Sequence, residues 1–136
     1  MIEQNLDREQ TLSYQFDIIA RDGDNQTGIQ HIYVTIDDIN DSAPKFERST
    51  YIVRDVSENW PIGTVIIRVH ADDDDAGVNS EINYYLVSSH ENAFDIDSTT
   101  GEIRIVEPLD YETKNHYQLE VEARDNGEGS KTDYAT

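Results

Sequence analysis

Apolar and polar residues alternate in short stretches through most of this chain. In the stretch 65–71, every odd-numbered position is apolar, from Val65 to Ala71. A period of two predicts a β-strand that turns one face toward a core. Similar patterns predict strands at 29–36, 51–56, 82–86, 93–96, 102–106 and 117–123.

Turn-forming residues separate these stretches, at 59–63, 98–101 and 125–127. No segment of useful length has the period of an α-helix. Short alternating strands joined by regular turns are typical of an antiparallel β-sandwich. The predicted fold class is therefore all-β, with the aromatic and β-branched residues of the inward faces forming the core.

The chain contains an internal repeat with an offset of 103 positions. Leu6-Asp7-Arg8-Glu9 matches Leu109-Asp110-Tyr111-Glu112, and the stretch 14–22 matches 117–125 without a gap. A period of this length predicts tandem small domains rather than a solenoid of short repeats. We expect 1–42 to be the C-terminal part of an upstream repeat and 43–136 to be a downstream repeat that lacks most of its last strand.

Two acidic clusters follow predicted strands. The first, 37–46, carries three aspartates and one asparagine within five residues. Pro44 then restricts the backbone of the connector. The second, 72–79, carries four consecutive aspartates, then Gly77 and Asn79. Carboxylate and amide oxygens are the ligands that calcium prefers, so both clusters are candidate calcium sites. An EF-hand is excluded, because Ala76 would occupy a ligand position and no helices flank the loop.

The charge balance limits the choice of partners. Ten Lys and Arg residues face 29 Asp and Glu residues, for a net charge of −19. This charge repels nucleic acid and anionic membrane surfaces. A solvated acidic surface is the simpler explanation of the excess, but clustering of the acids favours bound cations. The chain has no cysteine, no apolar run that could cross a membrane and no signal peptide at its start.

Five motifs in order resemble extracellular cadherin repeats of a non-classical or protocadherin-like type. DINDSAPKF at 38–46 is similar to the family's D-x-N-D-N-x-P-x-F, and ADDDDAGVN at 71–79 to its A-x-D-x-D-x-G-x-N. LDRE at 6–9 and LDYE at 109–112 resemble its L-D-x-E. VSENWPIGT at 56–64 and ARD at 20–22 and 123–125 complete the match. The resemblance implies a seven-stranded Greek-key sandwich, here interior repeats of a longer ectodomain, with three calcium ions in each linker between repeats.

The resemblance also implies a ligand set. The metal ligands carried over are Asp7, Glu9, Asp38, Ile39, Asn40, Asp41, Ser42, Asp73, Asp75, Asn79 and Asp125, with Ile39, Ser42 and Asn79 acting through backbone carbonyls. Ser42 stands where the family usually has asparagine. The family's bridging glutamate would precede Met1, so we expect one competent site and two weakened ones. Glu58, Asp110 and Glu112 are candidates for the next linker and are expected to bind no ion here.

The resemblance implies calcium-dependent cell–cell adhesion on the extracellular side of the plasma membrane, in a single-pass protein. The expected partners are calcium and other cadherin ectodomains, in homophilic or heterophilic pairs. One alternative is a calcium-stiffened spacer with no adhesive surface. An enzyme is a weak alternative, because these carboxylates converge on a joint rather than on a pocket. Asn25-Gln26-Thr27 and Asn40-Asp41-Ser42 match the glycosylation acceptor sequence, but Asn40 is better explained as a ligand.

Overall fold

The computed structural model describes residues 6–87 and 92–136. It divides the chain into two compact units, Met1–Ile39 and Asn40–Thr136. Within the described residues, the regular structure is strand except for one short 3₁₀ helix, η1 (Gly77–Ser80), so the predicted all-β class is confirmed. The described part of the chain holds no helix of the length and apolarity that a membrane span needs. The repeat boundary between residues 42 and 43 stays a prediction.

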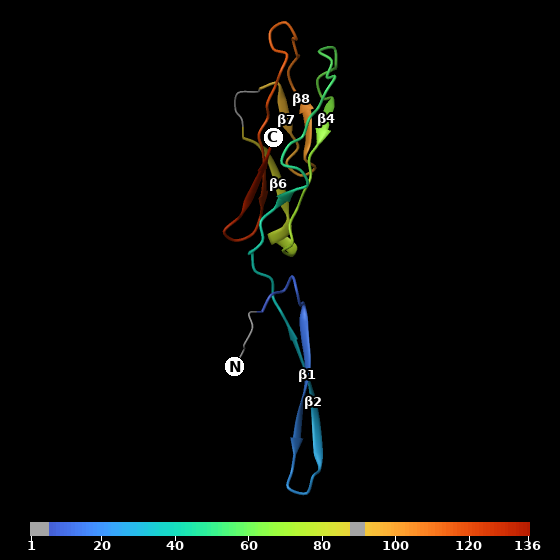
Figure 1. The fold of residues 1–136 in the computed structure, drawn as a ribbon, viewed down its shortest axis with the longest axis vertical. Helices are drawn as coiled ribbons and strands as arrows, with labels where there is room; N and C mark the ends of the chain where they lie inside the picture. Colours follow the sequence, from blue (N-terminus) through green and yellow to red (C-terminus); the bar gives the residue numbers. More distant parts are fainter. Residues whose placement is uncertain (1–5, 88–91) are drawn as a thin grey trace. The chain divides into compact units, whose positions relative to one another are not determined.

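The first unit is a long β-hairpin (Figure 1). Strand β1 (Ser13–Arg21) pairs antiparallel with β2 (Thr27–Thr35), in a register that runs from Ser13 opposite Thr35 to Arg21 opposite Thr27. The Asp22 N–H donates to the Gln26 carbonyl at 3.0 Å and closes the turn. Large apolar side chains remain exposed on this hairpin, including Phe16 at 50% and Ile18 at 53%.

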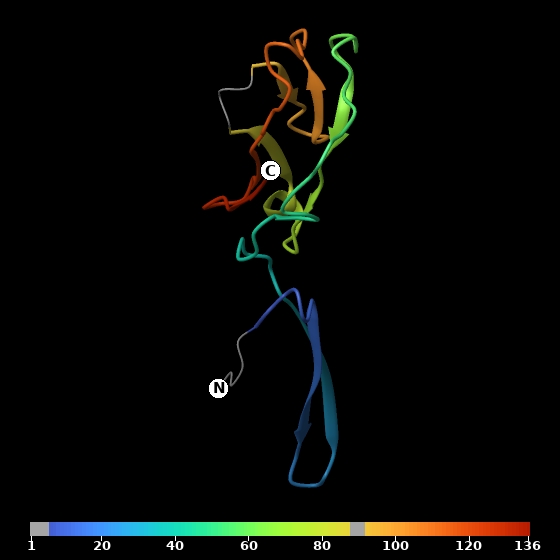
Figure 2. The same cartoon turned by 45° about the horizontal axis from the view of Figure 1, so that its top comes forward.

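The second unit contains the remaining strands. These are β3 (Lys45–Phe46), β4 (Val65–Arg68), β5 (Ala71–Asp72), β6 (Ile82–Leu86), β7 (Phe94–Ile96), β8 (Glu102–Ile105), β9 (Val121–Asp125) and β10 (Thr132–Ala135). They form two three-stranded sheets, in the orders β10-β9-β6 and β4-β8-β7, and a short β3-β5 pair. All pairs are antiparallel, and the two larger sheets are seen from different sides in Figures 1 and 2.

The hydrophobic core of this unit is built from both larger sheets. In β8, Ile103 and Ile105 are buried while Glu102 and Arg104 are partly exposed, as the alternation predicts. Across from them, Val121 and Ala123 of β9 belong to the same core cluster. The unit is therefore a sandwich of two sheets, each held to the other by the apolar residues of its inner face.

Three predicted strands differ from the structure. The stretch 65–71 is divided into β4 and β5, and the register of β4 on β8 shifts between Val65 and Ile67. The stretch 51–56 is not a strand, and near its end Asp55 adopts a left-handed φ of 60° that a pleated strand does not accommodate. Within the stretch 117–123, strand β9 begins only at Val121. Val121 is the first residue of β9 that pairs with β6 and with β10.

A buried tyrosine ties the core to the acidic loop that follows β5. The Tyr84 hydroxyl accepts a hydrogen bond from the Ala71 N–H at 3.0 Å and lies 3.5 Å from the Ala71 carbonyl oxygen. Burial raises the pKa of this phenol above its ordinary value. The backbone just before Asp73 is therefore fixed by a side chain of β6.

Gly101 occupies a position that alanine should not tolerate. Its φ is 71°, and a Cβ there would lie 2.4 Å from the Val69 carbonyl oxygen. We expect Gly101→Ala to lower the free energy of unfolding by about 1–3 kcal/mol, because the new atom meets rigid backbone in a strained conformation. Urea denaturation measures the loss. Gly23→Ala is the matched control, since nothing lies within 4 Å of its added Cβ; equal losses would contradict the prediction.

Candidate metal centre

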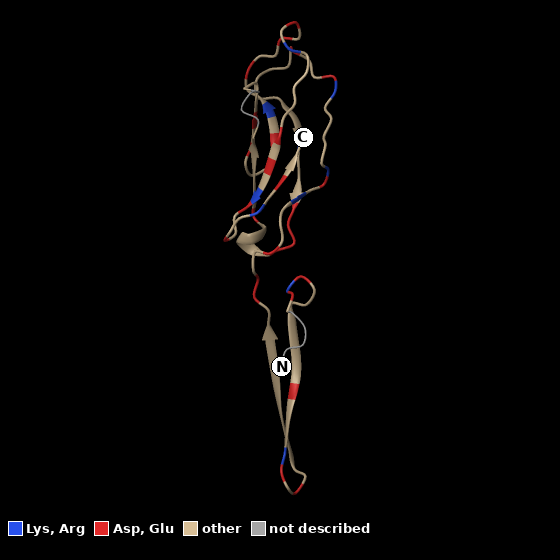
Figure 3. Ribbon diagram, turned by 60° about the vertical axis from the view of Figure 1, so that its left-hand side comes forward, with Lys and Arg blue, Asp and Glu red and all other residues tan. Residues whose placement is uncertain are grey.

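Acidic residues are distributed along both units (Figure 3), and in the sequence they are dense in the connector 37–41 and the loop 72–75. In the second unit, three segments distant in sequence converge. They are the start of the unit at Asn40, the loop after β5, and the end of β9 at Asp125. Hydrogen bonds from Asn40 to Asp125 and from Ser42 to Asp75 join these segments into one polar network.

Asn40 and Ser42 attach the start of this unit to the network. The Asn40 Nδ2 donates to Asp125 Oδ1 at 3.0 Å and to the Glu128 carbonyl at 3.3 Å. The Ser42 N–H lies 3.2 Å from both carboxylate oxygens of Asp75. Pro44, two residues further, is buried and anchors the segment. Asn40 and Ser42 are both among the ligands that the motif comparison selected.

Two aspartates of this network are buried, and a third, Asp73, is partly buried. Asp125 is 1% exposed and Asp75 is 6% exposed. Asp125 Oδ1 accepts the Gly127 N–H at 2.9 Å, and its Oδ2 accepts the Lys131 N–H at 2.8 Å. Asp73 Oδ1 accepts the Asp75 N–H at 2.9 Å. These backbone N–H groups offset part of the negative charge of the carboxylates.

The pKa of Asp73 is raised above its ordinary value. Burial is the main cause, and the nearby carboxylates of Asp75 and Asp125 add to it, while the hydrogen bond from the Asp75 N–H opposes it. The folded protein therefore disfavours the charged form of Asp73. A cation bound among these groups would remove that penalty.

Two buried oxygens of the network lack a hydrogen-bond donor. Within the described residues, these are Asn40 Oδ1 and Asp73 Oδ2. Buried polar atoms are rarely left without a partner, and an ion is one recognised explanation. A carboxylate oxygen and an amide oxygen are both suitable ligands for a hard divalent cation. The donor set and its two orphaned oxygens therefore fit calcium.

Two glycines shape the loops around the network. Gly77 has a left-handed φ of 59° and turns the chain into η1, which brings the Asn79 N–H to 3.2 Å from the Ala76 carbonyl. Gly127 has no room for a side chain, because an added Cβ would lie 2.4 Å from Asn40 Nδ2 and 2.5 Å from Asn79 Oδ1. The side chains of Asn40 and Asn79 can therefore lie this close to the backbone of residue 127 only because that residue is glycine.

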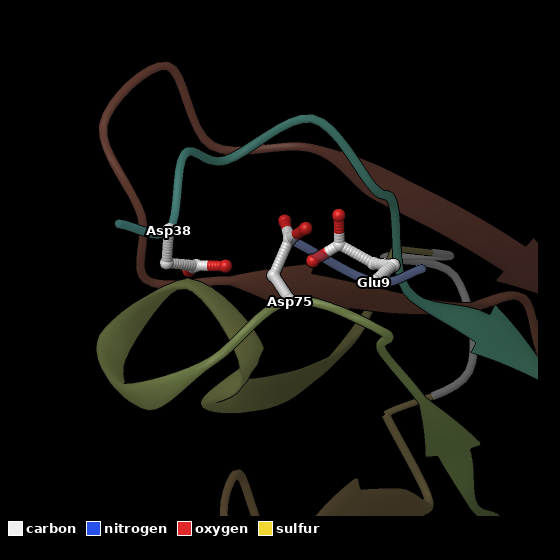
Figure 4. A group of neighbouring side chains, drawn as sticks. All are labelled: Glu9, Asp38 and Asp75. Atoms are coloured by element: carbon white, nitrogen blue, oxygen red, sulfur yellow. The ribbon is translucent and has the colours of Figure 1, made fainter. Parts of the chain in front are cut away.

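The first unit holds four of the predicted ligands. The Asp7 Oδ1 accepts the Gln10 N–H at 3.0 Å. Glu9 and Asp38, drawn in Figure 4, both contact the Arg8 guanidinium. Ile39 is 68% exposed. Asp75, also drawn in Figure 4, belongs to the second unit and is described above.

The residues predicted for the next linker form a separate group in the second unit. Carboxylate oxygens of Glu58, Asp110 and Glu112 lie within 4.8 Å of one another, and all three residues are exposed. The Tyr111 N–H donates to Glu58 Oε2 at 2.8 Å. Hydrogen bonds from Thr113 and Glu112 hold the pKa of Asp110 below its ordinary value. Their expected lack of an ion stays a prediction.

Motif comparison selected most of the network but not all of it. Asn40, Ser42, Asp73, Asp75 and Asp125 are joined by hydrogen bonds, whereas Asp41 is exposed. Two features were missed. One is the contact of Gly127 with the asparagine side chains, for which the sequence offered only a turn signal. The other is Arg8, whose position between two acids in the LDRE motif could have suggested an ion pair.

Comparisons with known proteins identify the family of this chain. The family model of the cadherin domain matches residues 52–136. Protocadherin alpha-5 of Homo sapiens is 38% identical over 131 residues, and protocadherin gamma-C4 of Homo sapiens is 37% identical over 134 residues. These matches cover 92% and 93% of this chain but 14% of either relative, so the chain spans about one seventh of their length.

Solved structures give the same result. A structure of mouse clustered PcdhgC3 EC1-3 aligns over 98% of this chain and 44% of its own, with a TM-score of 0.90 and 33% identity. A structure of mouse cadherin-23 EC22-24 aligns over 97% of this chain and 43% of its own, with a TM-score of 0.78 and 30% identity. The predicted cadherin-type fold is thereby confirmed. With its matched domain model, its relatives and its sandwich architecture, this chain belongs to the cadherin family and is protocadherin-like.

Proposed function

We propose that this chain is part of a cadherin ectodomain in which calcium, bound where one repeat joins the next, stiffens tandem repeats for cell–cell adhesion. Membership of the cadherin family supports a role in adhesion, since this is an adhesion family. It gives no support to an enzymatic role. The observation that carries the calcium part is the network of buried Asp75 and Asp125 with partly buried Asp73, in which two buried oxygens have no hydrogen-bond partner.

Asn40, Asp73, Asp75 and Asp125 would hold the ion in the second unit through side-chain oxygens, with Ser42 and Asn79 offering backbone carbonyls. Calcium accepts about six to eight oxygen ligands in flexible geometry, which suits a donor set of this size. Bound calcium would supply positive charge and nothing else. The protein residues do the rest: the Asp75 carboxylate orients Ser42, and the Asp125 carboxylate orients Asn40.

The order of the motifs extends the proposal to the upstream repeat and the connector. There, Asp7, Glu9, Asp38, Ile39 and Asp41 would complete the ligand set. Without calcium, like charges in these segments repel one another and the connector is free to bend. With calcium, oxygens from both sides of the connector would share ions, and the bending would stop. The competence of individual sites in this chain stays a prediction.

The location and partners follow from the same proposal. The chain would lie outside the cell, in a single-pass membrane protein, and its partners would be other cadherin ectodomains. A calcium-stiffened spacer with no adhesive surface is the alternative. Bead aggregation by the full ectodomain, with and without this segment, separates the two. Loss of aggregation by a deletion that is replaced with a repeat of equal length would support adhesion, and retention would support the spacer.

Calcium titration tests the central claim. Extracellular calcium modules have dissociation constants of about 10⁻⁴–10⁻³ M, so 10 mM calcium should stabilise the protein by roughly 1.5–3 kcal/mol relative to EDTA. Isothermal calorimetry gives the affinity, and urea denaturation gives the stabilisation. Magnesium at the same concentration is the control and should do much less, since it dehydrates reluctantly. No heat and no stabilisation with calcium would refute the proposal.

Gly127→Ala provides a sharper test of the site. Because the added Cβ would displace Asn40 and Asn79, we expect calcium affinity to fall about tenfold, a change equivalent to about 1.4 kcal/mol. Gly28→Ala is the control, since nothing lies within 4 Å of its added Cβ. Calorimetry on both variants measures the difference. An affinity that is unchanged in Gly127→Ala would place the ion elsewhere.

A further inference from the structure

Arg8 lies among residues that the proposed function assigns to calcium. Its Nε contacts Asp38 Oδ1, and its Nη2 contacts Glu9 Oε1. Both contacts lie within the first unit. One guanidinium thus neutralises two candidate ligands that come from separate parts of that unit, the turn before β1 and the connector after β2. Charge-assisted bonds of this kind are stronger than neutral ones, and arginine keeps its charge at every physiological pH.

The second copy of the motif shows what the position looks like without arginine. Tyr111 occupies the position that corresponds to Arg8, and its side chain is 64% exposed. There, the backbone N–H of Tyr111 contacts Glu58, while the acids Asp110 and Glu112 keep their places in the motif. The acids of the L-D-x-E motif therefore keep their places whether or not the third residue of the motif carries a positively charged side chain. The contact of an arginine with two acids is specific to the first copy.

We propose that Arg8 is an internal counter-ion that competes with calcium for Glu9 and Asp38. When calcium is absent, the guanidinium holds the two carboxylates together and reduces their repulsion. When calcium binds, these oxygens must leave the guanidinium for the metal, so the calcium concentration that stiffens this linker is higher than in a linker with tyrosine at this position. This inference rests on the proposed calcium function.

Calorimetric calcium titration of Arg8→Gln and Arg8→Tyr tests the competition in the full chain. Arg8→Tyr installs the residue that the second copy already carries. We expect both variants to bind calcium about tenfold more tightly at the affected site, the equivalent of losing one charge-assisted contact. Arg21→Gln is the control, because it changes the net charge equally, at the end of β1, and it should leave the affinity unchanged.

The outcomes are distinguishable. Equal tightening in Arg8→Gln and Arg21→Gln would reduce the effect to net charge and overturn the inference. Weaker binding in Arg8→Gln would show that Arg8 orders the ligands rather than competing for them, which also overturns it. Absence of calcium binding by the unmodified protein would refute the proposed function itself, before any variant is made.

An independent observation concerns the turn of the hairpin. Asn25 is exposed, has a left-handed φ of 63°, and begins the acceptor sequence Asn25-Gln26-Thr27. The other acceptor sequence begins at Asn40, whose Nδ2 already donates to Asp125 and Glu128 and lies against Gly127. The geometry points to Asn25 as the one of these two that carries an N-linked glycan. In that step, the amide nitrogen forms a bond to C1 of an oligosaccharide, displaces its lipid diphosphate carrier and releases a proton.

Mass spectrometry of the chain secreted from animal cells tests this assignment, which rests on the proposed extracellular location. We expect one glycan, removed by a peptide N-glycosidase that converts Asn25 to aspartate. Asn25→Gln and Thr27→Ala should both abolish it, whereas Gln26→Ala should keep it. A secreted protein without a glycan, or a glycan that persists in Asn25→Gln, would overturn the assignment. Calcium binding by the same material shows separately whether the proposed function holds.

Discussion

Asp73→Asn should abolish the calcium response of this protein and, in EDTA, make it more stable than the unmodified chain. The two effects have opposite signs because the carboxylate has two roles. It is a proposed calcium ligand, and it is also a partly buried group whose charged form the metal-free fold disfavours.

The stabilising effect follows from the surroundings of Asp73. Its pKa is raised by burial and by the carboxylates of Asp75 and Asp125. Because the pKa in the folded protein exceeds that in the unfolded chain, stability is lost as the pH rises through the folded pKa. Asparagine is neutral at every pH and avoids this loss. Its oxygen can still accept the Asp75 N–H, and its nitrogen takes the place of an oxygen that accepts no bond.

Thermal and urea denaturation, each with EDTA and with 10 mM calcium, measure both effects. The unmodified protein should gain roughly 1.5–3 kcal/mol from calcium, and Asp73→Asn should gain almost none. Asp74→Asn is the control, since it removes the same charge from an exposed neighbour. The interpretation fails if Asp74→Asn loses the calcium response to the same extent, or if Asp73→Asn is destabilised in EDTA.

Ile105→Ala should produce the largest loss of folding stability, about 2–5 kcal/mol. Ile105 is fully buried in β8, and it belongs to the core cluster that both larger sheets share. Its N–H and carbonyl bond to the Thr64 carbonyl and the Gly63 N–H, so the backbone cannot easily collapse into the cavity. A site that cannot collapse retains the cavity and pays its full penalty.

Val106→Ala is the matched control for Ile105→Ala, because Val106 is the next residue and is 36% exposed. We expect it to lose less than half as much stability in urea denaturation. Calcium should still stabilise the folded Ile105→Ala protein, since Ile105 is not among the proposed ligands. Similar losses in the two variants would mean that the core is not centred on β8.

The alternation of apolar residues predicted some strands better than others, for identifiable reasons. It placed 82–86 and 102–106 almost at the observed bounds of β6 and β8, where neighbouring strands pair along the whole stretch. It failed at 51–56, where alternation could not report the left-handed φ of Asp55 or the lack of a regular partner strand. It also overextended β9 before Val121, because alternation reports which face is buried and not where the partner strands end.

The candidate site was predictable to the extent that it consists of motif residues. Asp73, Asp75 and Asp125 could be selected because their spacing is regular in the family. The orphaned state of Asn40 Oδ1 could not be predicted, since it depends on which donors the folded chain brings near. The same holds for Gly127, whose lack of a side chain matters only once Asn40 and Asn79 lie beside it.

The hydrogen bond between the Tyr84 hydroxyl and Ala71 affects how inherited or engineered variants of this protein should be interpreted. Because it joins the sandwich interior to Ala71, a packing defect several residues from any ion could disturb the acidic loop. Such a defect would lower cell aggregation just as a lost ligand does, and an aggregation assay alone would misassign it. Only metal affinity measured well below the melting temperature would reveal which kind of damage a given variant carries.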